Sequence, residues 1–389
     1  MSARAARLLL PVIYLGFISL GLPDGTLGVA WPRMHESLAL PIGLAGPLLM
    51  VVTLLSGASS FSSGTIIARF KTGPVVLASC LMTGSALLLI SRADSLVWLA
   101  IAAAPLGFGA GAVDAGLNGY VARHYSGRHM NWLHACWGIG ATCGPLIITR
   151  SLGLETGWRG GYFAIASVQL TLVLVFLLTL RMWDAVPTRP FGSHASASGG
   201  PAPTLRANSE AGWISAALFA LYVAVETTAG LWAGSILAVG RGLPVTHAGL
   251  CVTAYYASIT IGRILVGCVV DRWGNRRLVT LGVLLSLAGA LAFTQATGTA
   301  LAAASLVLLG LGFAPVYPGL MHEVPKRFAA SAIQTVIGRQ SGAAYLGAAA
   351  LPALSGWIAQ KVSLDTIVWV VAGGIVLMFA GVRRLDRIS

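Results

Sequence analysis

Apolar runs of about 20 residues recur from end to end of this 389-residue chain. An α-helix needs a run of that length to cross the hydrocarbon core of a bilayer. Only 10% of the residues are charged and 56% are hydrophobic, whereas soluble domains carry roughly 25% charged residues. Because backbone groups in lipid must satisfy their hydrogen bonds internally, the pattern predicts an all-α membrane protein with many spans.

The runs predict twelve membrane-spanning helices in two groups of six. The first group covers residues 8–31, 41–67, 72–91, 96–122, 131–151 and 159–182. The second group covers residues 211–239, 245–270, 276–295, 299–324, 330–358 and 364–383. The composition between them, rich in Pro, Ser, Gly and Ala, is typical of a mobile linker. We therefore expect a six-helix bundle in 1–183, a cytoplasmic linker in 184–210 and a second six-helix bundle in 211–389.

Basic residues lie mostly in alternate connections between the predicted spans. The chain has 25 Lys and Arg against 12 Asp and Glu, a net charge of +13. Because Lys and Arg beside a span resist translocation, their placement predicts that both termini are cytoplasmic. Membrane orientation thus explains the basic charge, and we expect no nucleic-acid partner. Short loops and abundant arginine indicate a prokaryotic inner-membrane protein.

A very short basic turn with the pattern G-x-x-x-D-R-x-G-x-R-R joins two predicted spans at 267–277. Its glycines allow helix and turn to pack closely, and Asp271 can face the N-terminus of another helix. The pattern resembles the loop signature between the second and third helices of each half of the major facilitator superfamily. That resemblance implies two pseudo-symmetric six-helix bundles and a cytoplasmic gate formed by Gly267, Asp271, Arg272 and Gly274.

The two halves of the sequence look duplicated. Several glycines recur 203 residues apart, as in Gly107 and Gly310 (310 − 107), or Gly144 and Gly347 (347 − 144). Asp24 and Glu226 differ by 202 (226 − 24). Repeats of this kind imply a solute site near the bilayer midplane, between the halves. In the first copy of the turn, Ala68 stands where Asp271 would be and Lys71 where Gly274 would be, so we expect the gate only in the second copy.

Asp24 lies inside the first predicted span, in the sequence Gly-Leu-Pro-Asp-Gly. An ionisable side chain at the bilayer centre costs about 2.5–3.5 kcal/mol on insertion scales, so it needs a partner, water or a function. Pro23 removes a backbone donor and Gly25 loosens the helix, which gives water or solute access to the carboxylate. The alternative is a carboxylate that only caps a broken helix.

Asp114 and Asn118 lie four residues apart in the fourth predicted span, on one helix face. A carboxylate beside an amide, among small residues, suits a proton or a solute that carries hydroxyl groups. We expect Asp114 to be the main proton-coupling residue and Asp24 a second one. The alternative is a hydrogen bond between helices that only packs the bundle.

Four further residues complete the predicted solute site. Glu226 in the seventh span either pairs with Arg263 or Arg339 or binds solute, and the sequence leaves these possibilities open. His134 opens the fifth span, where it either relays protons or packs. The remaining aromatic candidates are Trp232 in the seventh span and Tyr317 in the tenth. We expect Asp24, Asn118, His134, Glu226, Trp232 and Tyr317 to contact solute.

Five segments resemble the fucose permease branch, whose members are fucose–galactose–glucose proton symporters. They are residues 21–31, 107–120, 131–145, 222–232 and 310–318. The resemblance implies that acidic groups of the first and fourth spans, matched to Asp24 and Asp114, serve sugar binding and proton coupling. Branch members with the Asn-x-x-His pattern found at 131–134 accept a broader range of solutes.

The sequence predicts a proton-coupled secondary transporter of a small polar solute, a sugar above all, that works by alternating access. An exporter of drugs or amphipathic metabolites by proton exchange is the alternative, which the glycines at 140–145 favour. The five cysteines lie in apolar runs without ligand spacing, and we find no nucleophile–base pair or phosphate loop. We therefore expect no enzyme activity, cofactor or metal, and a monomer whose partners are the solute, protons and the lipid bilayer.

Overall fold

The computed structural model describes residues 2–125, 127–183, 205–329 and 332–389. Apart from an isolated bridge between Leu205 and Phe328, the regular elements in those ranges are helices, so the predicted all-α fold is confirmed. Residues 184–204, most of the predicted linker, lie outside the described residues.

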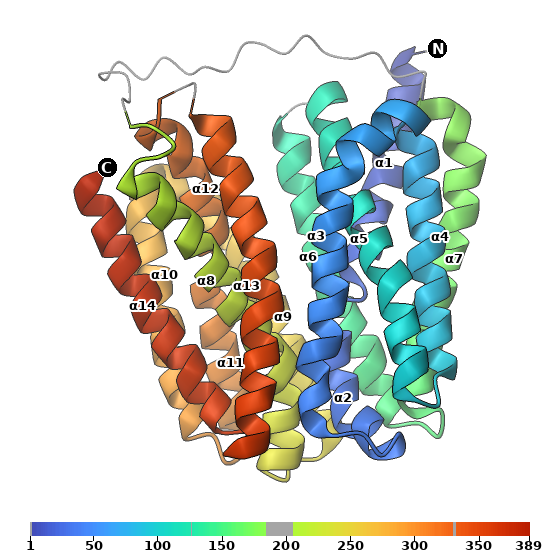
Figure 1. Ribbon diagram of the computed structural model, residues 1–389, viewed down its shortest axis with the longest axis vertical. Coiled ribbons are helices and arrows are strands. Elements are labelled where there is room, and N and C mark those ends of the chain that lie inside the picture. Colours follow the sequence, from blue (N-terminus) through green and yellow to red (C-terminus); the bar gives the residue numbers. More distant parts are fainter. Residues whose placement is uncertain (1, 126, 184–204, 330–331) are drawn as a thin grey trace. The chain divides into compact units, whose positions relative to one another are not determined.

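The N-terminal part of the chain is a run of helices joined by short turns (Figure 1). In chain order the elements are α1 (Ser2–Gly21), α2 (Thr26–Ser37), η1 (Ile42–Leu44), α3 (Ala45–Phe70), α4 (Thr72–Arg92), α5 (Leu96–His124), α6 (Gly127–Leu152) and α7 (Gly157–Trp183).

The C-terminal part continues in the same way. Its elements are α8 (Glu210–Ser235), the π-helical turn η2 (Ile236–Gly240), α9 (Val245–Trp273), α10 (Asn275–Thr294), α11 (Thr299–Phe313), α12 (Val316–Arg327), α13 (Ile333–Lys361) and α14 (Thr366–Ile388).

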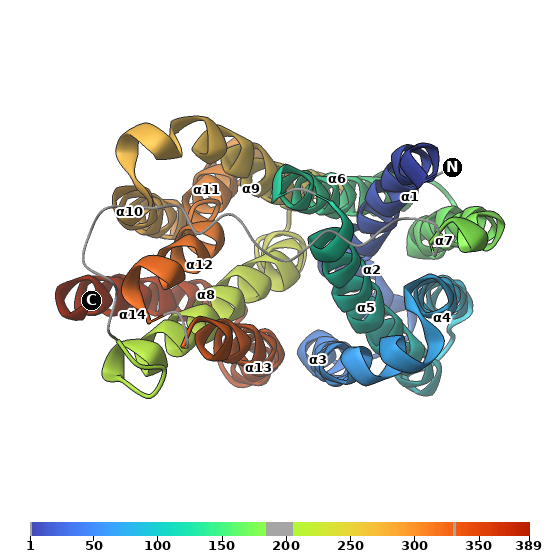
Figure 2. The same cartoon turned by 90° about the horizontal axis from the view of Figure 1, so that it is seen from above.

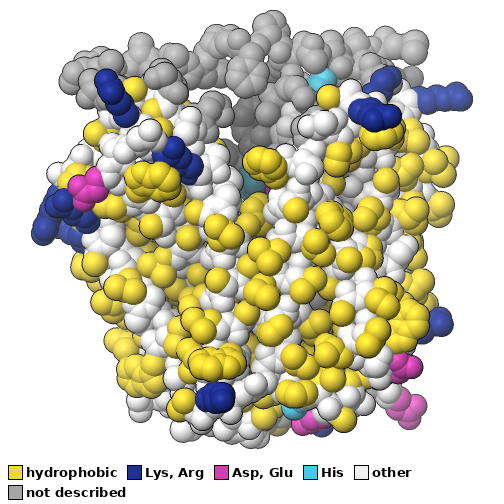
Figure 3. Space-filling model, viewed as in Figure 1, with side chains coloured by type: hydrophobic (Ala, Val, Ile, Leu, Met, Phe, Trp, Pro, Cys, Tyr) yellow, Lys and Arg dark blue, Asp and Glu magenta, His cyan; other side chains and the backbone are white. Residues whose placement is uncertain are grey.

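Eleven stretches of the described chain are helical, apolar and long enough to cross a membrane. Apolar side chains cover the middle of the helices, and charged ones lie near the helix ends (Figure 3). Helix α6, with 26 residues, is as long as the others but is not among the eleven. The twelfth span therefore stays a prediction.

Two of the spans contain a break at a proline. Between α1 and α2 the helix is interrupted at 22–25, where Gly25 has a φ of 72°. Between α11 and α12 the interruption falls at Ala314 and Pro315. Proline cannot donate the helical hydrogen bond and its ring crowds the preceding turn, which accounts for both breaks.

Contacts divide the chain into two compact units. Unit 1 comprises Met1–Thr26, Glu36–Leu40 and Val51–Ser198, and unit 2 comprises Leu27–His35, Pro41–Met50 and Gly199–Ser389. Parts of α2 and α3 thus belong to unit 2, although the sequence predicts them in the first bundle. Two glycines account for this, because Gly28 lies against the Gly230 carbonyl and Gly46 against the Pro352 carbonyl.

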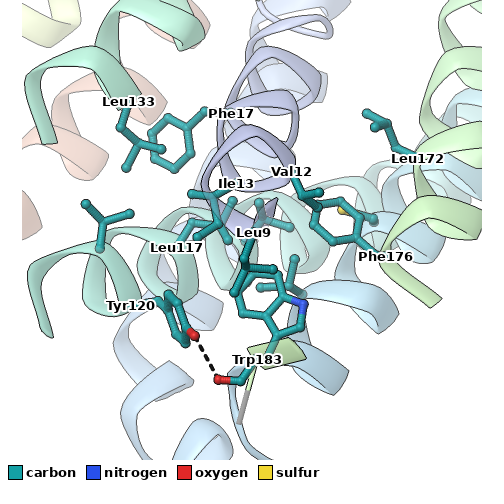
Figure 4. Close-up of a cluster of buried hydrophobic side chains, with 14 residues drawn as sticks. Leu9, Val12, Ile13, Phe17, Leu117, Tyr120, Leu133, Leu172, Phe176 and Trp183 are labelled. Carbon is teal, nitrogen blue, oxygen red and sulfur yellow. Dashed lines mark hydrogen bonds between the residues drawn. The ribbon is translucent and has the colours of Figure 1, made fainter. Parts of the chain in front are cut away.

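Unit 1 has a core built from α1, α4, α5, α6 and α7 (Figure 4). Phe17 of α1, Leu117 of α5 and Phe176 of α7 are almost completely buried in it. The Tyr120 hydroxyl donates a hydrogen bond of 2.7 Å to the Trp183 carbonyl, which ties α5 to the end of α7. This packing fixes α1, α5 and α6, the three helices that carry the polar side chains of unit 1.

Unit 2 is arranged around two helices. Helix α8 packs against α13, α14 and α9, and helix α10 packs against α11, α12 and α14. Seen from above, α9, α10 and α11 lie together on one side of this unit, and α8 lies beside α13 (Figure 2).

The predicted duplication is visible in the helix contacts. Among the glycines whose added Cβ would collide with a facing backbone carbonyl, the contacts of four form two pairs at the 203-residue offset. They are Gly107 with Val52 and Gly310 with Tyr255, then Gly109 with Ser79 and Gly312 with Gly282. The same small-residue contacts therefore pack α5 on its neighbours in unit 1 and α11 on its neighbours in unit 2.

The first helix of each half does not follow that offset. Gly144 lies against the carbonyl of Leu22, and its counterpart Gly347 lies against the carbonyl of Ala220. Leu22 and Ala220 differ by 198 (220 − 22), so Asp24 corresponds to Tyr222 by this contact. The equivalence of Asp24 with Glu226 therefore stays a prediction, which this contact does not support.

Candidate functional site

Asp24 lies in the break between α1 and α2. Its backbone N–H donates to the Gly21 carbonyl at 3.0 Å, which closes a turn in place of the continuing helix. Its side chain is half-buried, and its Oδ2 accepts a hydrogen bond of 2.7 Å from Trp137 Nε1 of α6. The break therefore presents the carboxylate toward α6 of the same unit.

The glycines of α6 bring Trp137 to Asp24. Gly140 lies against the Ile18 carbonyl, so α6 and α1 touch through their backbones. Trp137 is one turn before Gly140 and three residues after His134. The sequence alone did not identify Trp137 as a partner of Asp24. Its spacing nevertheless places it on the face of α6 that carries His134, Gly140 and Gly144.

Asp114 and Asn118 meet on α5. Asn118 Nδ2 donates to Asp114 Oδ1 at 2.9 Å, and both residues are half-buried. No cation lies within ion-pair distance of Asp114 among the described residues. The carboxyl group is thus paired with a neutral amide, as the spacing predicts.

A second polar group of unit 1 lies where α1 meets the start of α6. The Tyr14 hydroxyl and His129 Nδ1 are 2.7 Å apart, and His134 stacks edge-on against Phe17 with centroids 5.8 Å apart. His134 is exposed, whereas His129, which has no distinctive pattern in the sequence, makes the hydrogen bond. Tyr14 and His129 lie 115 residues apart, and no local spacing links them, so this pair needed the structure.

In unit 2, Glu226 of α8 faces Arg263 of α9. Arg263 Nη2 and Glu226 Oε1 are 3.8 Å apart, and the two side chains are 25% and 14% exposed. Such a separation is an ion pair but too long for a strong hydrogen bond. Of the two partners considered, Arg263 is the one that Glu226 meets.

Tyrosines surround this ion pair. The Tyr255 hydroxyl donates to the Glu226 backbone carbonyl at 2.9 Å, and the Tyr222 hydroxyl neighbours both charged groups. Tyr317 of α12 packs on the ring of Tyr222, with centroids 6.1 Å apart, and interacts electrostatically with Arg263. Tyr222 is four residues before Glu226, a helical spacing that could have identified it.

Two residues of the sequence analysis lie elsewhere in unit 2. Arg339 donates to the Ala207 carbonyl and to Asn208 Oδ1, both at 2.7 Å, just before α8 begins. Trp232 is completely buried, and its Nε1 donates to the Pro352 carbonyl at 3.0 Å. This placement favours packing of α8 on α13 as the role of Trp232.

The predicted gate is the turn between α9 and α10. Gly274 has a φ of 75°, and Asp271 and Arg272 on the last turn of α9 are exposed. Among the described residues, an added Cβ at Gly267 would meet nothing within 4 Å, so the expected close packing is not made there.

The polar side chains around Asp24 and Asp114 in unit 1 and around Glu226 in unit 2 offer acid–base and hydrogen-bonding chemistry. Within the described ranges, no cluster of three or more His, Cys, Asp or Glu side chains could hold a metal ion. Carboxylates, an amide, phenols and a guanidinium suit the recognition of a polar solute and the exchange of a proton.

Comparisons with known proteins agree with this architecture. The sequence profile of the Major Facilitator Superfamily matches residues 13–238 and 214–387. An uncharacterised MFS-type transporter of Yersinia pestis is 23% identical over 97% of this chain and 91% of its own length. An uncharacterised MFS-type transporter of Mycobacterium tuberculosis is 26% identical over 92% of this chain and 89% of its own length.

Two solved structures share the fold. The nucleoside transporter NupG aligns with a TM-score of 0.73 at 13% identity, over 96% of this chain and 98% of that one. A bacterial homologue of the human lysosomal transporter Spinster aligns with a TM-score of 0.77 at 12% identity, over 100% and 98%. With the profile covering both halves of the sequence, the chain belongs to the major facilitator superfamily and is a multi-pass membrane transporter.

Proposed function

We propose that the protein is a proton-coupled secondary transporter of a small polar solute, with sugars as the first class to test. Asp114 carries the proton in this proposal. Asp24 and Asn118 of unit 1 and Glu226 of unit 2 bind hydroxyl groups of the solute, and His134 and Tyr317 are further solute contacts in this proposal.

The observation that carries the proposal is the pairing of Asp114 with a neutral partner. A half-buried carboxylate beside an amide has no fixed charge to balance it, so gaining a proton removes an unfavourable buried charge. Glu226 differs because Arg263 compensates it. Protonation of Asp114 can then favour one state of the transporter over another, which is the differential affinity that coupling needs.

The substrate class rests on the hydrogen-bonding groups. Asp24 and Asn118 offer acceptors and donors for hydroxyls. Tyr317 is half-buried and packs on the ring of the buried Tyr222, which neighbours Glu226. NupG, which shares the fold, is a nucleoside transporter. Nucleosides contain a sugar and an aromatic base, so they are the second class of polar solute to test.

Export of amphipathic compounds by proton exchange is the second candidate. The Gly140 to Pro145 pattern in the sequence favours it, whereas the contact of Gly140 and Gly144 with α1 fits either direction of transport. The charged and hydrogen-bonding groups around Asp24 and Glu226 favour a polar solute instead.

The test is proton movement into proteoliposomes that hold purified protein and a pH-sensitive dye. L-fucose, D-galactose, D-glucose and uridine are added outside in turn, without a pH gradient. Inward proton movement with at least one of these solutes supports the proposal. Its absence with all four, together with proton release driven by the amphipathic cation ethidium, contradicts it and supports the exporter.

A further inference from the structure

Arginines gather where α10 begins and α14 ends. Arg276 and Arg277 lie in the first turn of α10, and Arg383, Arg384 and Arg387 lie in the last turns of α14. Lys and Arg side chains are grouped at the end of α14 in Figure 3. Both helices belong to unit 2 and pack against each other.

On α14 the arginines extend an apolar exposed face. Trp369, Val376 and Leu377 are 59%, 50% and 65% exposed. Arg383 and Arg387 follow at helical spacing on the same face, and both are exposed. A face of this kind on a membrane span touches lipid, so the arginines lie where lipid tails give way to headgroups.

Helix α10 has the same arrangement. Leu281, Leu284 and Leu291 are exposed on one face, and Arg277 precedes them at helical spacing, four residues before Leu281. Arg277 therefore stands at the head of a second lipid-facing apolar face, beside the one on α14.

The acidic residues at this end pair with other cations. Asp386 accepts from Arg327 at 2.6 Å and lies 4.0 Å from Arg276, and Glu210 pairs with Arg384 at 2.9 Å. The Arg276–Asp386 contact also shows that the start of α10 adjoins the end of α14.

Three arginines remain without such a partner. Among the described residues, Arg277, Arg383 and Arg387 take part in no ion pair or side-chain hydrogen bond. Glu323, the other buried acid at this end, is held by Arg276 and Lys326 at 2.9 Å each.

We propose that Arg277, Arg383 and Arg387 bind the phosphate headgroup of an anionic phospholipid whose acyl chains lie along α10 and α14. Guanidinium groups match phosphate oxygens in pairs, and the apolar faces below them match the chains. Topology alone explains basic residues at a cytoplasmic end. It does not explain why the uncompensated ones continue the lipid-facing sides of two adjoining helices.

The test uses full-length protein purified in dodecyl maltoside and titrated with dioleoylphosphatidylglycerol or dioleoylphosphatidylcholine. Native mass spectrometry counts retained lipids, and a thermal melt reports stabilisation. The site variant is R277Q/R383Q/R387Q. The control, R69Q/R181Q/R206Q, removes the same charge from three exposed arginines predicted on the same side of the membrane.

We expect wild type and control to retain phosphatidylglycerol in preference to phosphatidylcholine. The site variant should bind phosphatidylglycerol at least tenfold more weakly, because each Arg near an anionic headgroup raises the affinity roughly fivefold. Equal losses in the two variants would mean diffuse attraction to the whole basic side and overturn the proposal. So would a wild type without preference, or the same melt shift from sn-glycerol 3-phosphate, which has no acyl chains.

Discussion

Lys71 and Gly274 share one backbone conformation at turns that lie 203 residues apart (274 − 71). Lys71 has φ 66° and ψ 162°, and Gly274 has φ 75° and ψ 149°. The N–H of Lys71 bonds the Ile67 carbonyl at 2.8 Å, and that of Gly274 bonds the Val270 carbonyl at 2.8 Å. The two turns are copies of each other, but only the second has the residue suited to this region of φ and ψ.

Lys71→Gly should therefore stabilise the protein. A non-glycine residue in this region of φ and ψ is strained by about 1–3 kcal/mol, and glycine removes most of that strain. Glycine also raises the conformational entropy of the unfolded chain, which offsets part of the gain. We expect a gain of about 1 kcal/mol and a higher melting temperature in detergent. Gly274→Lys should lower the melting temperature. Shifts of the same sign in both variants would show that the turns are not equivalent.

Gly312→Ala should destabilise unit 2. Its Cβ would meet the Gly282 carbonyl at 2.5 Å, where backbone must move, so we expect a loss of about 1–3 kcal/mol. Gly267→Ala is the matched control, because the same methyl group meets nothing within 4 Å there among the described residues. Thermal melts of both variants measure the difference. Equal destabilisation would contradict the packing described for α10 and α11.

Trp137→Phe should impair function more than folding. It keeps an aromatic ring, although a smaller one, and removes the N–H that donates to Asp24, a charge-assisted hydrogen bond of the kind that contributes about 1.5–3 kcal/mol. We expect a loss of solute-induced proton movement in proteoliposomes. Trp98→Phe on exposed α5 surface is the control. Unchanged transport by Trp137→Phe would remove Asp24 from the site as we describe it.

Glu226 and Arg263 should show strong coupling. The pair is half-buried, so removing one partner leaves a partly uncompensated charge and costs less than the ~3–5 kcal/mol typical of a fully buried pair. Glu226→Gln and Arg263→Gln should each lower the melting temperature, and the double variant should recover part of the loss. Transport then separates the two roles: a stable double variant that still carries solute would make the pair structural only.

Local patterns in the sequence were sufficient for the features that depend on a few neighbouring residues. Pro23 and Gly25 predict the break that separates α1 from α2, and the spacing of Asp114 and Asn118 predicts their hydrogen bond. The offset of Gly107 and Gly310 predicts the repeated helix contacts. Each inference uses fixed helical geometry or a residue with a restricted backbone.

Contacts between distant spans could not be predicted in the same way. Arg263 and Arg339 are both arginines within predicted spans, and only the packing of α8 on α9 shows which one meets Glu226. Trp232 looked available for solute, but the approach of α13 buries it completely. Trp137 reaches Asp24 because α6 touches α1 at glycines, a closeness that one sequence does not specify.

The central claim is that Asp114 couples the proton to the solute, and Asp114→Asn tests it most directly. The substitution keeps the size of the side chain and an oxygen that accepts from Asn118, but it removes the titratable carboxyl group. The measurement is uptake of labelled sugar into proteoliposomes, for whichever of L-fucose, D-galactose or D-glucose the wild type carries. With an inward proton gradient, we expect the variant not to accumulate sugar above its outside concentration. Exchange of labelled for unlabelled sugar across the membrane should be retained. Accumulation that persists in Asp114→Asn would contradict the account.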